Sequence, residues 1–405
     1  MAQLNIRLLL AVAVIIVAVQ VAGWLMARIR QPRVIGEIIA GILLGPSLLG
    51  LVAPGVATYL FPAEVIGGLQ VLSQFGLVLF MFLVGLHLDT SQLRGNGRTV
   101  AAVAPASLLV PLALAVGLGA VIYGEFGADV DPLGFCIFLG AAMAVTAMPV
   151  LARILVDLGL DTQRTGIISL ACAAINDLVA WCLVAVVVAV IGSSEPLGTL
   201  TTVGFALAFV AVLLFVVRPL LGRLARLPVW GVIVVTVLSA WTAEQIGIHA
   251  IIGAFLAGLI MPRHPAWRLE VEHRLDAVVR NLLLPIFFAV AGIATRIDQL
   301  TMAAVVLLGA VIVIAVVGKI GAATVAARLV GERWSDAATL GVLMNTRGVT
   351  ELVILALGLE LHIIDSTVYT VMVLMALVTT LMAAPLLGLL RVRAARWREP
   401  APRCQ

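Results

Sequence analysis

The chain has 405 residues, of which 63% are hydrophobic and only 11% are charged. Ordinary soluble domains carry roughly 25% charged residues, so this composition excludes a soluble enzyme or a soluble binding module. A mean hydropathy of +1.19 predicts an all-α polytopic membrane protein whose outer faces contact lipid. The sequence has no Gly-rich nucleotide loop, no metal-ligand spacing and no nucleophile–base pattern, so neither an enzyme nor a cofactor site is predicted.

Hydrophobic runs predict the transmembrane helices, since one span needs about 20 apolar residues. Thirteen runs meet or approach this length: residues 5–28, 33–52, 67–88, 99–122, 132–156, 163–191, 197–217, 229–247, 249–263, 281–297, 300–329, 335–358 and 366–391. Between the short ninth and tenth runs, residues 264–280 predict an amphipathic interfacial helix with room to continue into the tenth.

Positive charge alternates along these runs. All but four of the 25 basic residues fall in every second loop, and the exceptions are Arg7, Arg296, Lys319 and Arg347. By the positive-inside rule, the N-terminus is predicted outside and the C-terminus inside, with residues 392–405 as a cytoplasmic tail. This placement also accounts for a pI near 9.2 without a nucleic-acid partner.

Two pairs of segments indicate an internal repeat. Phe80–Leu86 resembles Phe287–Ile293, and Gly36–Pro46 loosely resembles Gly253–Pro262, in the same order and at similar offsets. Chance similarity in a Leu-, Val- and Gly-rich sequence is the alternative. Order and offset together favour a duplication.

The predicted repeats cover about residues 33–191 and 249–391, with five helices each. Since an odd number of helices separates their starts, the two repeats have opposite orientations in the membrane. Inverted repeats are typical of secondary transporters, which bind their substrates near the midplane between the repeats.

Asn176 and Asp177 lie near the middle of the run 163–191. A carboxylate at that depth costs about 2.5–3.5 kcal/mol on insertion scales, so an acid there indicates function. Two interpretations stay open. Asp177 is paired structurally with a buried base, or it binds a proton and a metal cation in turn.

Two spans carry polar breaks, each in the fourth helix of its repeat. In the span 132–156, Pro149 removes a helix hydrogen bond and frees a carbonyl near Thr146, which adds a hydroxyl. Such oxygens suit a monovalent cation, although a simple kink is the alternative. The pattern therefore predicts broken helices that cross at mid-membrane.

The corresponding span 335–358 contains Asn345, Arg347 and Glu351, and the last two are spaced for an ion pair on one helical face. Lys319, in the span 300–329, is the chain's only lysine. It is predicted either to meet Asp177 at the centre or to tie its own helix to a backbone carbonyl.

The chain resembles the monovalent cation:proton antiporters of the sodium/hydrogen exchanger fold. It is most similar to the branch with bacterial sodium/proton antiporters, glutathione-gated potassium efflux systems and plant cation/proton exchangers. The resemblance rests on Phe80–Asp89, Thr146–Pro149, Ala174–Asp177, Lys319, Asn345–Gly348 and Glu351.

The resemblance implies a homodimer in which each chain has two parts. Residues 1–90 and 229–297 would form a dimerisation panel, and residues 99–191 and 300–391 a core that moves past it like an elevator, with 197–217 as a linker helix. The efflux systems carry a soluble nucleotide-binding domain after the membrane part. This chain ends soon after its last predicted helix, so that regulation is expected only from another chain.

The resemblance also assigns roles to residues. Asp177 matches the family's ion-binding aspartate, and Asn176 stands where electrogenic relatives have a second aspartate, which implies electroneutral exchange. The predicted site comprises Asp177, Asn176 and Thr146, and its supporting residues are Lys319, Arg347, Glu351, Asn345 and Pro149.

The predicted function is exchange of Na⁺ or K⁺ (or Li⁺) for H⁺ by a multi-pass protein of the cell membrane. Two alternatives stay open. One is a sodium-coupled symporter of an organic solute on the same inverted-repeat architecture, and the other is a channel-like or sensor subunit that does not transport alone.

Overall fold

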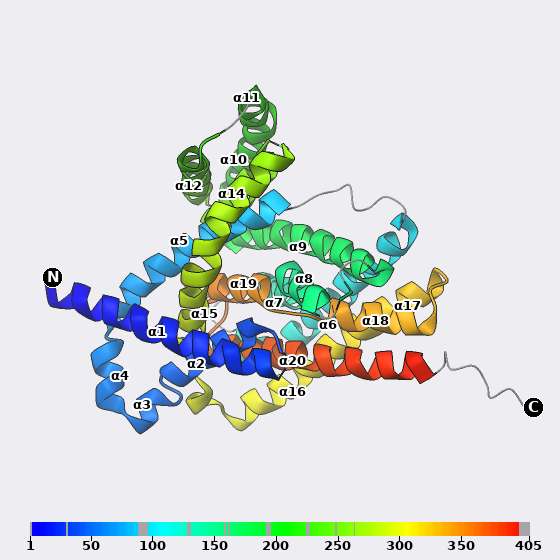
Figure 1. The fold of residues 1–405 in the computed structure, drawn as a ribbon, viewed down its shortest axis with the longest axis horizontal. Coiled ribbons are helices and arrows are strands. Elements are labelled where there is room, and N and C mark those ends of the chain that lie inside the picture. Colours follow the sequence, from blue (N-terminus) through cyan, green and yellow to red (C-terminus); the bar gives the residue numbers. More distant parts are fainter. Residues whose placement is uncertain are drawn as a thin grey trace, which may run out of the picture. The chain divides into compact units, whose positions relative to one another are not determined.

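The computed structural model describes residues 2–29, 31–87, 96–127, 131–157, 159–160, 163–191, 196–223, 227–247, 249–262 and 264–396 (Figure 1). Every regular element in these ranges is a helix. The predicted tail is therefore described only as far as Arg396, and the last residues of the segment Phe80–Asp89 lie outside the described residues.

The helices follow one another with short connections. In chain order they are α1 (Ala2–Arg28), α2 (Arg33–Leu44), α3 (Leu49–Val52), α4 (Pro54–Leu60), α5 (Ala63–His87), α6 (Gly97–Phe126), α7 (Pro132–Ala144), α8 (Met148–Asp157), α9 (Arg164–Ile191), α10 (Pro196–Val212), π-helix η2 (Leu213–Val217), α11 (Arg218–Arg223), α12 (Val229–Ile246), α13 (Ala250–Ile260), α14 (Pro265–Val278), π-helix η3 (Val279–Leu283), α15 (Leu284–Ile293), 3₁₀-helix η4 (Ile297–Gln299), α16 (Met302–Val316), π-helix η5 (Val317–Gly321), α17 (Ala322–Leu329), α18 (Trp334–Met344), α19 (Val349–Glu360) and α20 (Ser366–Arg396).

Ten helices in the described part of the chain are long and apolar enough to cross a membrane. The remaining three predicted spans correspond to the short helix α13 and to the interrupted pairs α7/α8 and α18/α19. The predicted interfacial segment 264–280 does continue into the next span, because α14 and α15 join through η3 into one helix over Ala266–Ile293. The protein is a multi-pass membrane protein.

The chain divides into two compact units. The first comprises Met1–Ala22, Gly36–Asp89 and Trp181–Asp298, and the second comprises Gly23–Ile35, Thr90–Ala180 and Gln299–Gln405. The helices α1, α2 and α9 each contribute residues to both units.

In the first unit, α2 and α15 approach each other backbone to backbone. A Cβ atom added to Gly41 would lie 2.4 Å from the carbonyl oxygen of Ala289, and one added to Gly292 would lie 2.5 Å from that of Ile38. Both positions therefore admit only glycine at this spacing. Close approach through small residues is a common way to associate helices in a membrane, where water does not drive the association.

A second crossing, between α5 and α13, has the same construction. A Cβ on Gly85 would lie 2.2 Å from the carbonyl oxygen of Phe255, and one on Gly258 would lie 2.2 Å from that of Phe82. In the aligned repeat segments, Gly258 is the counterpart of Gly41 and Gly292 that of Gly85. The first segment of each repeat thus packs on the second segment of the other.

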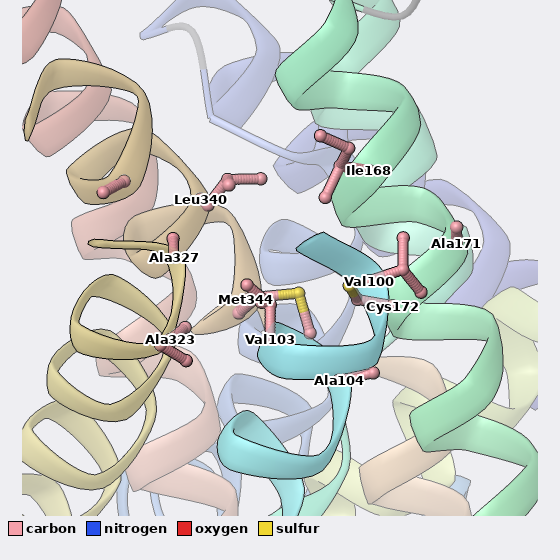
Figure 2. Packing of buried hydrophobic residues seen from close by; sticks show 12 residues of the cluster. Val100, Val103, Ala104, Ile168, Ala171, Cys172, Ala323, Ala327, Leu340 and Met344 are labelled. Carbon is pink, nitrogen blue, oxygen red and sulfur yellow. The ribbon is translucent and has the colours of Figure 1, made fainter. Parts of the chain in front are cut away.

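The second unit has an apolar core of small residues. Figure 2 shows side chains of α6, α9, α17 and α18 meeting at this core, among them Val103, Cys172, Ala323 and Met344. Alanines on α17 recur at helical spacing and keep the four helices close. The same four helices carry or border most of the polar groups described next.

Candidate functional site

Two helices of the second unit are interrupted in the middle. The first stops at Ala144 and resumes at Met148, and the second stops at Met344 and resumes at Val349. Pro149 is the second residue of α8. Proline is tolerated there because an N–H in the first turn of a helix has no acceptor within the helix, so the N–H that proline lacks is not missed. The break therefore falls just before Pro149. Both predicted breaks are confirmed.

The two breaks are bonded to each other. The amide of Ala147 donates to the carbonyl of Thr346 over 3.1 Å, and the Thr146 hydroxyl donates to the carbonyl of Met344 over 3.0 Å. Main-chain groups that the helices leave without a partner therefore find one across the crossing. In a membrane interior this pairing is needed, because no water is present to replace it.

Two positively charged side chains donate hydrogen bonds to the carboxyl end of α7. Lys319 donates its ammonium to the carbonyl of Ala144 over 2.7 Å and to the Thr146 hydroxyl over 2.5 Å. Arg347 donates to the carbonyl of Met143 over 2.8 Å. The last carbonyls of a helix carry partial negative charge, so this is where positive groups are most favourable. The short π-helix η5 contains Lys319, and π segments often occur at functional positions.

Asp177 lies at the other side of the same break, beside the amino end of α8. Its side chain is 1% exposed, and its Oδ2 atom accepts the Met148 amide at the start of α8 over 3.3 Å. A helix amino end favours negative charge, so Asp177 and the two cations match the dipoles of the two half-helices. Oδ1 of Asp177 is buried and has no hydrogen-bond partner.

Asn176 adds a second open oxygen. Its Nδ2 donates to the Ser107 hydroxyl of α6 over 3.0 Å, which orients the amide, and its Oδ1 is buried without a partner. A buried carboxylate with an open oxygen is costly unless a proton or a cation satisfies it. The chemistry of Asp177 therefore suits either a proton or a cation.

Within the described residues, Asp177 makes no ion pair within 4 Å. Lys319 lies on the α7 side of the break and Arg347 pairs with Glu351 over 2.7 Å, both fully buried. The interpretation of Asp177 as a structural ion-pair partner thus finds no support. In the structure, Lys319 ties its own helix to a backbone carbonyl, which is one of its two predicted roles. The predicted Arg347–Glu351 pair is confirmed.

The other predicted site residues differ in whether their polar atoms already have hydrogen-bond partners. The Thr146 hydroxyl is already engaged with Met344 and Lys319, so its role as a cation ligand stays a prediction. Asn345 ends α18 with its Oδ1 buried and without a partner.

Two hydroxyls at this site were missed from the sequence. Ser107 orients Asn176, and Thr380 of α20 binds the main chain of Arg347. Single hydroxyls in apolar helices give little signal, because most of them bond to their own helix. Proximity to Pro105 and Pro111 was the one available sign for Ser107.

Comparison with known proteins places this architecture in a family. The family model described as "Sodium/hydrogen exchanger, transmembrane" matches residues 14–390. The chain is 38% identical over 400 residues to Na(+)/H(+) antiporter NhaS4 of Synechocystis sp., covering 94% of this chain and 96% of that protein. The chain belongs to the sodium/hydrogen exchanger family.

Longer eukaryotic relatives match over part of their length. Identity is 33% over 395 residues to Cation/H(+) antiporter 19 of Arabidopsis thaliana and 31% over 381 residues to K(+)/H(+) antiporter 1 of Saccharomyces cerevisiae. The matches cover 95% and 89% of this chain but only 49% and 43% of those proteins. The chain thus spans about half the length of these relatives.

A solved structure supports the fold. The sodium proton antiporter MjNhaP1 from Methanocaldococcus jannaschii superposes with a TM-score of 0.63 over 95% of this chain and 99% of that one. Sequence identity is 14%, so this similarity concerns the fold alone.

Proposed function

We propose that this protein is a secondary antiporter that exchanges a monovalent cation, Na⁺ or K⁺, for H⁺ by alternating access. The observation that carries the proposal is Asp177, a buried carboxylate that accepts the first amide of α8 at a helix break and keeps its other oxygen unpartnered. Relatives over most of this chain are named as Na⁺/H⁺ and K⁺/H⁺ antiporters, which favours exchange over sodium-coupled symport of an organic solute.

The exchange follows from the geometry of one site. A buried carboxylate cannot stay charged and unsatisfied in a dry interior, so it holds a proton or a cation at each passage. Both compete for the same oxygens of Asp177, and each expels the other. Asn176 contributes an oxygen but no charge, so one cation replaces one proton and the exchange is electroneutral.

The supporting residues hold the site in place. Lys319 and Arg347 donate to carbonyls at the carboxyl end of α7 and offset the partial negative charge there. Glu351 balances Arg347. Asn345 and Thr146 become further cation ligands when the two helix breaks rearrange. Pro149 fixes the place where α8 begins.

The wider assignments are part of the same proposal. The chain crosses the cell membrane thirteen times with its N-terminus outside and its C-terminus inside. Residues 1–90 and 229–297 form a panel that dimerises, residues 99–191 and 300–391 carry the ion, and 197–217 link the two. The alternation of arginine-rich loops supports the orientation.

The test is a pH-jump flux assay in proteoliposomes with Na⁺, K⁺ and Li⁺ in turn. We expect Asp177→Asn to abolish cation-dependent proton flux. Glu360→Gln, an exposed acid at the end of α19, serves as the control and is expected to exchange like the wild type. Normal exchange by Asp177→Asn would refute the assignment of the site.

The same vesicles separate the alternatives. An electroneutral antiporter works at a rate that ignores an imposed membrane potential, so clear voltage dependence would overturn the stoichiometry. Solute uptake that needs Na⁺ without proton counterflow would favour the symporter. Saturable, pH-dependent exchange by the purified chain would exclude a channel-like or sensor subunit.

A further inference from the structure

Thr380 of α20 is bonded to the main chain of the second helix break. Its side chain is 2% exposed. The hydroxyl accepts the Arg347 amide over 3.2 Å and donates to the Arg347 carbonyl over 2.9 Å. One hydroxyl therefore serves both main-chain polar groups of a single residue in the break.

The break needs such a partner. Residues 346–348 lie outside α18 and α19, and Gly348 has a positive φ of 154°, a conformation that favours glycine. In a membrane interior, irregular backbone persists only where protein groups satisfy it. A threonine that both accepts and donates is suited to this task, because a hydroxyl offers one donor and two acceptor positions.

Contacts lead from Thr380 to the ion site in short steps. The Arg347 side chain holds Met143 at the end of α7, and the neighbouring carbonyl of Thr346 accepts the Ala147 amide. The next amide along, that of Met148, donates to Asp177. A displacement of the break at Arg347 therefore moves the donor that faces the carboxylate.

We propose that Thr380 is a positioning residue for cation exchange, whose hydroxyl fixes the α18–α19 break and thereby the Met148 amide against Asp177. This inference rests on the proposed function of Asp177. Without the hydroxyl, the amide no longer stabilises the carboxylate form that binds the cation, so the proton competes more effectively. The loss falls on apparent cation affinity rather than on turnover at saturation.

The experiment compares Thr380→Val, which is nearly isosteric and lacks the hydroxyl, with Thr380→Ser, which keeps it. Flux is measured in proteoliposomes as a function of Na⁺ and of K⁺ at fixed pH. We expect Thr380→Val to raise KM about three- to tenfold, with kcat changed less than about twofold, as expected for the loss of one typical hydrogen bond between neutral groups. Thr380→Ser is expected to match the wild type.

The neighbouring threonine provides the matched control. Thr379 is also buried on α20, but its hydroxyl donates to Met375 of its own helix over 2.8 Å. Thr379→Val is therefore expected to leave KM unchanged. If Thr380→Val does not yield folded protein, Thr380→Cys takes its place. Its thiol is a weaker donor than a hydroxyl, so we expect KM to rise above that of the wild type, but by less than the rise predicted for Thr380→Val.

The outcomes separate this inference from the proposed function. Unchanged KM in Thr380→Val, or in Thr380→Cys where Val does not fold, would overturn it while Asp177→Asn stays inactive. Equal rises of KM in Thr380→Ser and Thr380→Val, or a rise in Thr379→Val, would also overturn it. Exchange by Asp177→Asn would instead remove the proposed function.

Discussion

The two units of this protein bury different kinds of contacts. In the first, helices meet at glycines, and Gly85 and Gly258 let α5 and α13 touch backbone to backbone. In the second, the crossing of the broken helices is held by charged side chains, with Lys319, Arg347 and Glu351 fully buried. The glycine contacts of the first unit are sensitive to added volume, whereas the contact between the two broken helices is sensitive to lost charge or lost hydrogen bonds.

This difference follows from what each backbone offers. Continuous helices satisfy their own main chain, so they need only small side chains to pack closely. Broken helices expose amides and carbonyls that must be satisfied by other groups, here by side chains and by the other break. The polar groups that satisfy them lie around the proposed ion site, so the second unit is where ion binding is proposed.

The largest expected effect comes from breaking the buried ion pair. Arg347→Met leaves Glu351 without its partner in a dry interior, and such a loss costs about 3–5 kcal/mol of unfolding free energy. Thermal unfolding in detergent would measure it. The double variant Arg347→Met/Glu351→Leu removes both charges and is expected to recover most of the stability. A single variant as stable as the wild type would contradict the pair's structural role.

Much of the fold could be predicted from the sequence, because the residue patterns that cause the fold can be recognised there. Apolar runs and alternating arginines mark the spans, and Pro149 and the polar residues around Asn345 mark the two breaks. The repeated glycine segments also proved informative, since the first segment of each repeat packs on the second segment of the other repeat.

The partners of the site residues could not be predicted equally well. Lys319 could be placed at mid-membrane, but its acceptors are a main-chain carbonyl and the Thr146 hydroxyl, and backbone acceptors leave no trace in a sequence. The charges of residues 264–280 predict an interfacial helix but do not fix where it ends. In the structure α14 carries most of these charges, and the π-helix η3 joins it to α15.

A smaller effect is expected from added volume in the first unit. Gly85→Ala would place a methyl group against the carbonyl of Phe255, and overpacking of this kind costs about 1–3 kcal/mol. The control is Gly67→Ala on the same helix α5, where no atom lies within 4 Å of the new Cβ. It is expected to be neutral or slightly stabilising, because alanine favours helix more than glycine does. Equal unfolding temperatures for the two variants would contradict the close crossing.

The smallest effect concerns Glu332, which links the α17–α18 connection to the starts of α6 and α9 in the second unit. Its carboxylate accepts two bonds from Arg164, at 2.6 and 2.7 Å, and one from the Thr99 hydroxyl at 2.7 Å. These bonds, with that from Arg164 the strongest, hold the pKa of Glu332 below its usual value of 4.5. Since the Arg164 side chain is 56% exposed, we expect Glu332→Gln to cost only about 1 kcal/mol at neutral pH.

The pH dependence of that cost has a defined sign. A carboxyl group whose folded-state pKa is lowered stabilises the fold while it is charged, and the contribution is lost as the pH falls through that pKa. The difference in unfolding temperature between wild type and Glu332→Gln should therefore be constant near neutrality and shrink below about pH 4.5. Glu270→Gln, which breaks an exposed pair with Arg274, is the control and should show little difference at any pH. A gap between wild type and Glu332→Gln that widens on acidification would show that Glu332 does not act as a charged acceptor at this helix junction.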